Sequence, residues 1–176
     1  MILRMNKLGL GLVILTAMGY SGCATNIGLP QTRDEFVAMY KPGGMFRNAE
    51  HVTVSRPFKS VVADVTEYAN KCLNVRETHA PSYQYKEAGG STTYRSKTET
   101  IKGGAVSLSL QEKYNDRTDS GAPPGGIFTL VAEMRAIGGG KTQLDIYHAS
   151  RGKAADSLKQ WAEGDSRICP SFERGW

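Results

Sequence analysis

The clearest hydrophobic pattern in the chain is an apolar stripe that begins just after Pro57. Apolar side chains recur there at steps of three and four residues, the spacing of one face of an α-helix. The stripe consists of Phe58, Val61, Val62, Val65, Tyr68, Ala69 and Cys72. Proline is favoured in the first turn of a helix. The pattern therefore predicts an amphipathic helix of about 16 residues that buries one face and ends near Cys72.

Between residues 82 and 149 the pattern changes to the alternation of β-strands. Apolar and polar side chains take turns, which indicates strands with one buried and one solvated face. The apolar positions are Val106, Leu108, Leu110, Phe128, Leu130, Ala132, Met134, Leu144 and Ile146. Ser107 and Ser109 are expected on the solvated face, and the threonine-rich residues 91–101 predict an edge or solvated strand. Glycine clusters separate the segments, so the strands should form an antiparallel meander.

Two shorter patterns flank this region. Residues 51–54 are rich in β-branched side chains and predict a strand. A second helical face, which Gly164 should end, contains Ala154, Ala155, Leu158, Trp161 and Ala162. The order predicts an α+β fold: a two-layer sandwich of a meander sheet with one long and one C-terminal helix on one face. In topology alone it resembles the helix-grip arrangement.

Residues 23–50 have the composition of a tether, with two prolines and a Gly-Gly pair. Fully extended, this segment would span about 90 Å. Within it, residues 34–40 predict a short helix, because Thr32 and Glu35 have the spacing of a capping box. Phe36, Val37 and Tyr40 would then dock on the domain and shorten the tether.

The N-terminus has the layout of an export signal. Arg4 and Lys7 precede an uncharged run of eleven residues, 8–18, and small residues follow. Such a run is far shorter than the roughly 20 residues of a membrane-spanning helix, whereas a positive start and a short apolar run are typical of a cleaved leader. Met5 is an alternative start to Met1.

Ser21-Gly22-Cys23 closes this leader and resembles the lipobox of bacterial lipoproteins. The resemblance implies cleavage before Cys23, acylation of Cys23 and a membrane anchor. The family usually has leucine where this chain has Tyr20, which implies slower cleavage. In enteric-type bacteria aspartate after the cysteine resembles an inner-membrane retention signal, so Ala24 implies the outer membrane, facing the periplasm. The alternative is an ordinary secretory signal.

Charge and the remaining cysteines refine this prediction. The leader carries two positive charges, so its removal lowers the net charge from +5 to +3. The basic residues are scattered among acids, which argues against a nucleic-acid partner. Cys72 and Cys169 are an even pair for an oxidising compartment and predict a disulfide. Two free thiols or half of a metal site are the alternatives.

Motifs for chemistry are missing from the sequence. His51, His79 and His148 share no metal-ligand spacing with one another, with cysteine or with carboxylates. There is no Gly-x-Ser-x-Gly, and the glycine pairs lack the Lys-Ser/Thr of a phosphate loop. The acidic residues Glu112, Asp116 and Asp119 lack the calcium-loop spacing. We therefore expect no metal, no cofactor and no enzymatic activity.

One binding groove can be suggested. Tyr83, Tyr85 and Tyr94 could line it beside Arg95, although aromatic residues on a sheet also serve in the core or in cross-strand pairs. The predicted organisation is a signal peptide at 1–22, a lipidated tether at 23–50 and one α+β domain at 51–176. The expected function is a non-enzymatic envelope lipoprotein, held to the membrane by lipid on Cys23, that binds a protein, peptidoglycan or lipid partner. A carrier or sensor of small hydrophobic ligands and an unrecognised periplasmic hydrolase are the alternatives.

Overall fold

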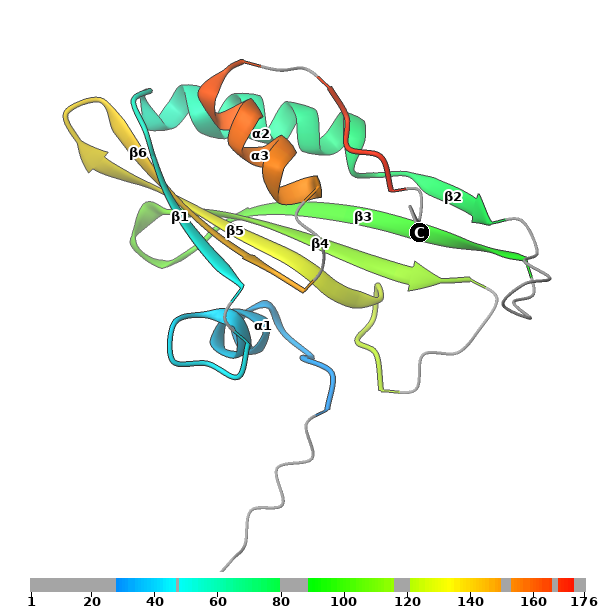
Figure 1. Cartoon of the computed structure of the whole chain (residues 1–176). Helices are drawn as coiled ribbons and strands as arrows, with labels where there is room; N and C mark the ends of the chain where they lie inside the picture. Colours follow the sequence, from blue (N-terminus) through cyan, green and yellow to red (C-terminus); the bar gives the residue numbers. More distant parts are fainter. Residues whose placement is uncertain are drawn as a thin grey trace, which may run out of the picture.

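A single antiparallel sheet forms the centre of the protein. The computed structural model describes residues 28–46, 48–79, 89–115, 121–149, 153–165 and 168–172. Within these ranges six strands pair in the order β1-β6-β5-β4-β3-β2 (Figure 1). They are β1 (Ala49–Val54), β2 (Arg76–His79), β3 (Gly90–Thr100), β4 (Val106–Tyr114), β5 (Ile127–Gly138) and β6 (Lys141–His148). The predicted α+β fold with a meander sheet is therefore confirmed.

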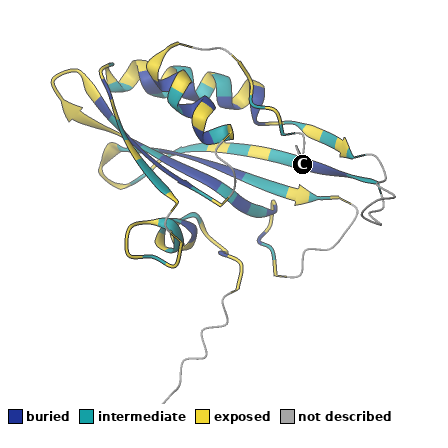
Figure 2. Ribbon diagram, in the orientation of Figure 1, coloured by how far each residue is buried: buried dark blue, intermediate teal, exposed yellow. Residues whose placement is uncertain are grey.

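Two helices cover one face of this sheet, as predicted. They are α2 (Phe58–Cys72) and α3 (Lys153–Glu163) (Figure 1). Their buried sides, which include Val61, Val65, Leu158 and Trp161, pack on apolar side chains of the sheet. The sheet contributes Leu108, Leu110, Leu130, Ala132, Met134, Leu144 and Ile146, each at most 2% exposed. Figure 2 shows the buried positions along the central strands and the sheet-facing sides of the helices.

A third helix, α1 (Arg33–Tyr40), lies on the opposite face of the sheet (Figure 1). Its expected cap is present, because the Thr32 hydroxyl accepts a hydrogen bond from the Glu35 N–H at 3.2 Å. Phe36 is 1% exposed and packs on Phe128 and neighbouring side chains of the sheet. The helix thus adds a short third layer to the predicted sandwich.

Phe128 departs from the predicted alternation, which placed it on the same face as Leu130. Leu110 pairs with Leu130, but Gln111 pairs with Phe128, so Thr129 is an extra residue in β5. A β-bulge of this kind shifts the facing of the side chains on one side of it. Phe128 therefore joins the second apolar cluster, with Phe36, Val131 and Tyr147, under α1.

The short strand β2 pairs with the first four residues of the polar strand β3, Gly90 to Thr93. Beyond Thr93 no described strand pairs on that side of β3, so this part lies at the edge of the sheet, as expected. Strand β2 was not predicted, because its four residues show no distinct hydrophobic pattern. The hairpin between β5 and β6 is made by Gly138, Gly139 and Gly140, all with positive φ, a conformation that costs glycine little.

None of the helices in the described ranges is long and apolar enough to span a membrane.

Gly164 ends α3, as predicted, through a pair of backbone hydrogen bonds. The Asp165 N–H donates to the Gln160 carbonyl and the Gly164 N–H to the Trp161 carbonyl, both at 3.1 Å. This is a Schellman motif, which favours glycine in the left-handed position. The Arg56 guanidinium donates to the Ala162 carbonyl at 2.8 Å, so the helix end is fastened to the segment between β1 and α2.

Candidate functional site

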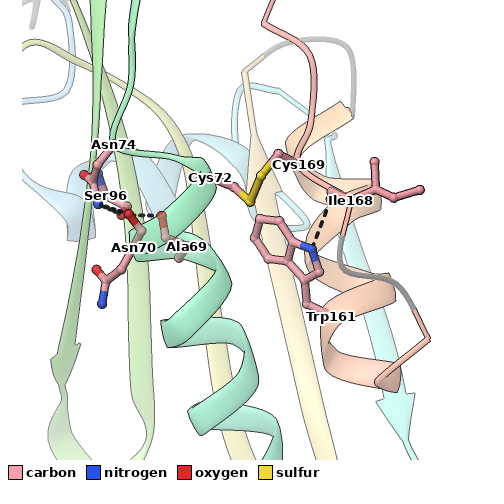
Figure 3. The surroundings of a disulfide bond; sticks show 8 residues. All are labelled: Ala69, Asn70, Cys72, Asn74, Ser96, Trp161, Ile168 and Cys169. Atoms are coloured by element: carbon pink, nitrogen blue, oxygen red, sulfur yellow. Dashed lines mark hydrogen bonds between the residues drawn. A yellow bond between two sulfur atoms is a disulfide. The ribbon is translucent and has the colours of Figure 1, made fainter.

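The C-terminal segment is fastened to the long helix by a disulfide between Cys72 and Cys169 (Figure 3). Cys72 lies in the last turn of α2 and is 2% exposed. Cys169 lies beyond α3, and the two Cα atoms are 5.1 Å apart. The bond therefore connects the end of α2 with the tail that follows α3.

Trp161 lies beside this bond and is completely buried (Figure 3). Its indole N–H donates to the Ile168 carbonyl at 3.3 Å. Its ring centroid is 5.9 Å from that of Tyr68 on α2. One side chain of α3 thus contacts both the long helix and the segment that carries Cys169.

Tyr94 and Arg95 do not line one groove. Tyr94 faces the layer of α2 and α3, where its ring stacks on Phe172 with centroids 4.2 Å apart. Arg95 is exposed on the opposite face, because successive side chains of a strand alternate between faces. Tyr94 therefore has the role of the alternative prediction: it packs in the core and does not line a groove. Tyr83 and Tyr85 lie outside the described residues.

A group of charged side chains crosses the α1-bearing face of the sheet, and we call it the charged row: Arg33, His51, Glu133, Arg135 and Asp145. His51, Asp145 and Glu133 occupy paired positions on β1, β6 and β5. Arg135 Nη2 lies 2.6 Å from Asp145 Oδ2 and 3.2 Å from Glu133 Oε2. Arg33 Nη1 reaches from α1 to Glu133 Oε1 at 2.5 Å. Each carboxylate therefore has at least one arginine partner.

The charged row also corrects the prediction for Ser107 and Ser109. Both serines lie on the face opposite α2 and α3, as expected, but they are 1% and 7% exposed and not solvated. The Arg33 guanidinium donates to the Ser107 hydroxyl at 3.3 Å. Ser107 is covered by Arg33 of α1, and the Ser109 hydroxyl donates to the Lys97 carbonyl of β3. The alternation within the strand does not reveal either contact.

The geometry of the charged row does not make a nucleophilic triad. His51 Nδ1 lies 2.7 Å from Asp145 Oδ1, which resembles the base and orienting acid of such a site. Ser107, which pairs with Glu133, is on β4, three strands away from His51 on β1. Neighbouring strands are about 4.8 Å apart, so the two side chains are separated by roughly 14 Å. A hydrogen bond between nucleophile and base is therefore impossible in this arrangement.

Tyr147 belongs to the second apolar cluster and lies two positions from Asp145 of the charged row on β6. Burial is the main cause that raises its pKa above the usual value, and the charges of Asp145 and Glu133 act in the same direction. The raised pKa keeps the phenol neutral through and beyond the physiological range. The residue therefore serves packing against α1.

Replacing Arg33 by methionine tests what the charged row does for α1. Loss of the guanidinium removes the contact with Glu133 but leaves Arg135 beside that carboxylate, so we expect about 1–2 kcal/mol less stability. The effect should be local, with faster hydrogen exchange at the Phe36 and Lys41 amides. Arg95→Met, on an exposed site of the same face, is the control and should change stability by less than about 0.5 kcal/mol. Equal exchange in both variants would show that Arg33 does not hold α1.

The other histidines have separate local partners. His79 Nε2 lies 2.8 Å from the Thr92 hydroxyl, and His148 Nε2 lies 3.2 Å from Glu50 Oε1. Lys159 of α3 also contacts Glu50, and its hydrogen bonds with Asp156 and then Glu50 raise its pKa. Among the described residues, no group of three or more His, Cys, Asp or Glu side chains is placed to hold a metal ion.

Comparison of the chain with protein-family models, with curated proteins and with solved structures finds no match.

Proposed function

We propose that this chain is a non-enzymatic lipoprotein of the bacterial cell envelope. Lipid on Cys23 would hold it to the outer membrane, and the folded domain would bind an envelope partner. The observation that carries this proposal is the order of a positive start, a short apolar run and Ser21-Gly22-Cys23. Two or three acyl chains on one cysteine give stable anchoring, whereas one chain holds only marginally.

The position of α1 supports an anchor close to the domain. Arg33 and Phe36 fix this helix to the sheet, so only residues 24–32 separate Cys23 from a docked helix. Fully extended, residues 24–32 span at most about 35 Å. A tether that is free up to residue 50 would span about 90 Å. The domain of an acylated chain would therefore remain near its membrane.

The packing between the sheet and the helices favours binding at a surface over carriage of a ligand inside. Val61, Leu108, Met134, Ile146 and Trp161 line this interface from both sides, and water reaches none of their surfaces. A carrier of hydrophobic ligands needs an open volume at this position. The separated His51 and Ser107 likewise provide no support for a hydrolase.

The proposal is tested by Cys23→Ala in cells that are supplied with a radioactive fatty acid. We expect the variant to incorporate no label and to accumulate as a longer precursor, because the acceptor sulfur and the cleavage site are lost together. Cys169→Ala is the matched control and should remain labelled. Normal labelling of Cys23→Ala would refute the anchor.

A second measurement concerns the partner. Cross-linking in intact cells should join the domain to a protein or to peptidoglycan of the envelope. We expect the same product from the wild type and from a variant whose acylated N-terminus is intact but whose Arg33 is replaced. Recovery of the domain without any envelope component would remove the support for a binding function.

A further inference from the structure

Basic side chains gather on the half of the sheet that α1 leaves uncovered. We call this group the basic face: Arg76, Arg95, Lys97 and Lys113. They come from β2, β3 and β4, and all four residues are exposed. The register brings them together, since Arg76 pairs with Thr93, Thr93 pairs with Lys113, and Arg95 and Lys97 are the next positions of β3 on that face.

Few acids balance this charge. On β2, β3 and β4, Glu99 is the only acidic residue that the register and the alternation place on the same face, and it contacts Lys97 at 2.5 Å. Glu77 and Glu112 belong to the opposite face, because they pair with Thr92 and Tyr94. The acids of the charged row are already paired with Arg33 and Arg135. The basic face therefore keeps an excess of positive charge.

The anchored end of the chain approaches the same side of the sheet. α1 packs on this face through Phe36 and Arg33, and the Gln31 side-chain amide donates to the Gly121 carbonyl at 2.6 Å. Leu29, before α1, is 37% exposed, and Met45 and Phe46, after it, are 53% and 40% exposed. Apolar side chains thus remain exposed on both sides of the helix that is nearest to Cys23 in the sequence.

We propose that the face of the sheet that carries α1 and the basic face lies against an anionic phospholipid surface. The proposal rests on the proposed lipid anchor, which would keep this side within about 35 Å of the bilayer. Lys and Arg near an anionic membrane surface each strengthen binding by about fivefold, and this attraction falls off within a Debye length. Apolar side chains beside basic ones add binding by entering the interface. The layer of α2 and α3 then faces away from the membrane.

The test uses the acylated mature protein on two kinds of vesicle, one of phosphatidylcholine alone and one with a third of phosphatidylglycerol. Co-sedimentation first establishes that the protein is bound to both. Lysines are then labelled briefly with an amine reagent and quantified by mass spectrometry. We expect Lys97 and Lys113 to react at least about threefold more slowly on the anionic vesicles. Lys59 and Lys71, exposed on α2, are the internal controls and should react equally on both.

Salt and charge variants sharpen the outcome. Raising the salt concentration to about 1 M should remove the protection, because the Debye length shrinks to about 3 Å. Replacing Arg95, Lys97 and Lys113 together by glutamine should weaken binding of the unacylated chain to anionic vesicles by at least about tenfold. The matched pair Lys59→Gln and Lys71→Gln should leave that binding unchanged.

The results separate this inference from the proposed anchor. An acylated residue 23 with equal reactivity of Lys97 on both vesicles overturns the inference and leaves the anchor intact. Stronger protection of Lys59 and Lys71 than of Lys97 also overturns it, because the opposite side would then face the lipid. If residue 23 carries no lipid, the anchor fails, and salt-sensitive binding of the unacylated chain to anionic vesicles still decides the inference.

Discussion

Replacing Cys72 and Cys169 together by alanine is expected to lower the free energy of unfolding by about 3–4 kcal/mol. The bond joins residues 97 positions apart, and closing a loop of that size restricts the unfolded chain by an amount equivalent to about 4–5 kcal/mol in the chain-entropy model. The measured value is usually smaller than that limit. Denaturant unfolding of the mature domain under oxidising conditions measures the difference.

Reduction of the wild type supplies the control for this prediction. A reductant should lower the unfolding midpoint of the wild type to about that of the alanine variant and leave the variant itself unchanged. A free-thiol count after unfolding without reductant should find neither Cys72 nor Cys169. Two reactive thiols, or an unfolding curve that does not respond to the reductant, would contradict the role of the bond.

Trp161→Ala is the second variant with a large expected effect, a loss of about 3–5 kcal/mol. The side chain is fully buried, packs near Tyr68 and holds the Ile168 carbonyl. Its removal leaves a cavity between α2, α3 and the tail that carries Cys169. Thermal or denaturant unfolding measures the loss.

Trp161→Phe separates packing from hydrogen bonding at this site. Phenylalanine retains most of the ring contact but has no N–H for the Ile168 carbonyl, so we expect a loss of about 1–2 kcal/mol. The alanine effect should shrink in the variant without the disulfide, since the tail is then already released and the two sites share a partner. A Trp161→Ala protein as stable as the wild type would show that this contact does not organise the tail.

The parts of the fold that follow from local patterns were predictable. The stripe from Phe58 to Cys72 specifies α2 without reference to any other segment, and the alternation around Leu108 and Leu144 specifies strands in the same way. Gly164 could be recognised as the end of α3 because the left-handed position favours glycine. The cap at Thr32 could also be predicted from local sequence, because its hydrogen-bond partner Glu35 is only three residues away.

The parts that depend on distant pairing were not predictable. The bulge at Thr129 exists only in relation to β4, so Phe128 was assigned to the wrong side of the sheet. His51 and Asp145 are 94 residues apart in the sequence, and the residues around them contain no pattern that predicts the contact. Arg95 and Tyr94 illustrate a different error, because adjacent residues of one strand point to opposite faces and could have been separated from the sequence alone.

The charge of the sheet surface shows the same limit. Arg76, Arg95, Lys97 and Lys113 are interspersed with acids along the chain, which is why the sequence indicated no basic patch. In the sheet the basic residues are separated from most of these acids, because the register of β2, β3 and β4 places alternate residues of each strand on one face. The charge on one face of a meander sheet therefore depends on which alternate positions of each strand are charged, more than on the composition of each segment.

The covalent link between Cys72 and Cys169 encloses β2 to β6 and α3. A single peptide-bond cleavage anywhere between these cysteines consequently releases no fragment, since both halves stay joined through sulfur. A protease-nicked molecule would migrate as one species on a gel without reductant and as two pieces with it. In a compartment that contains proteases but few reductants, the protein can thus tolerate a broken backbone without losing any of its mass.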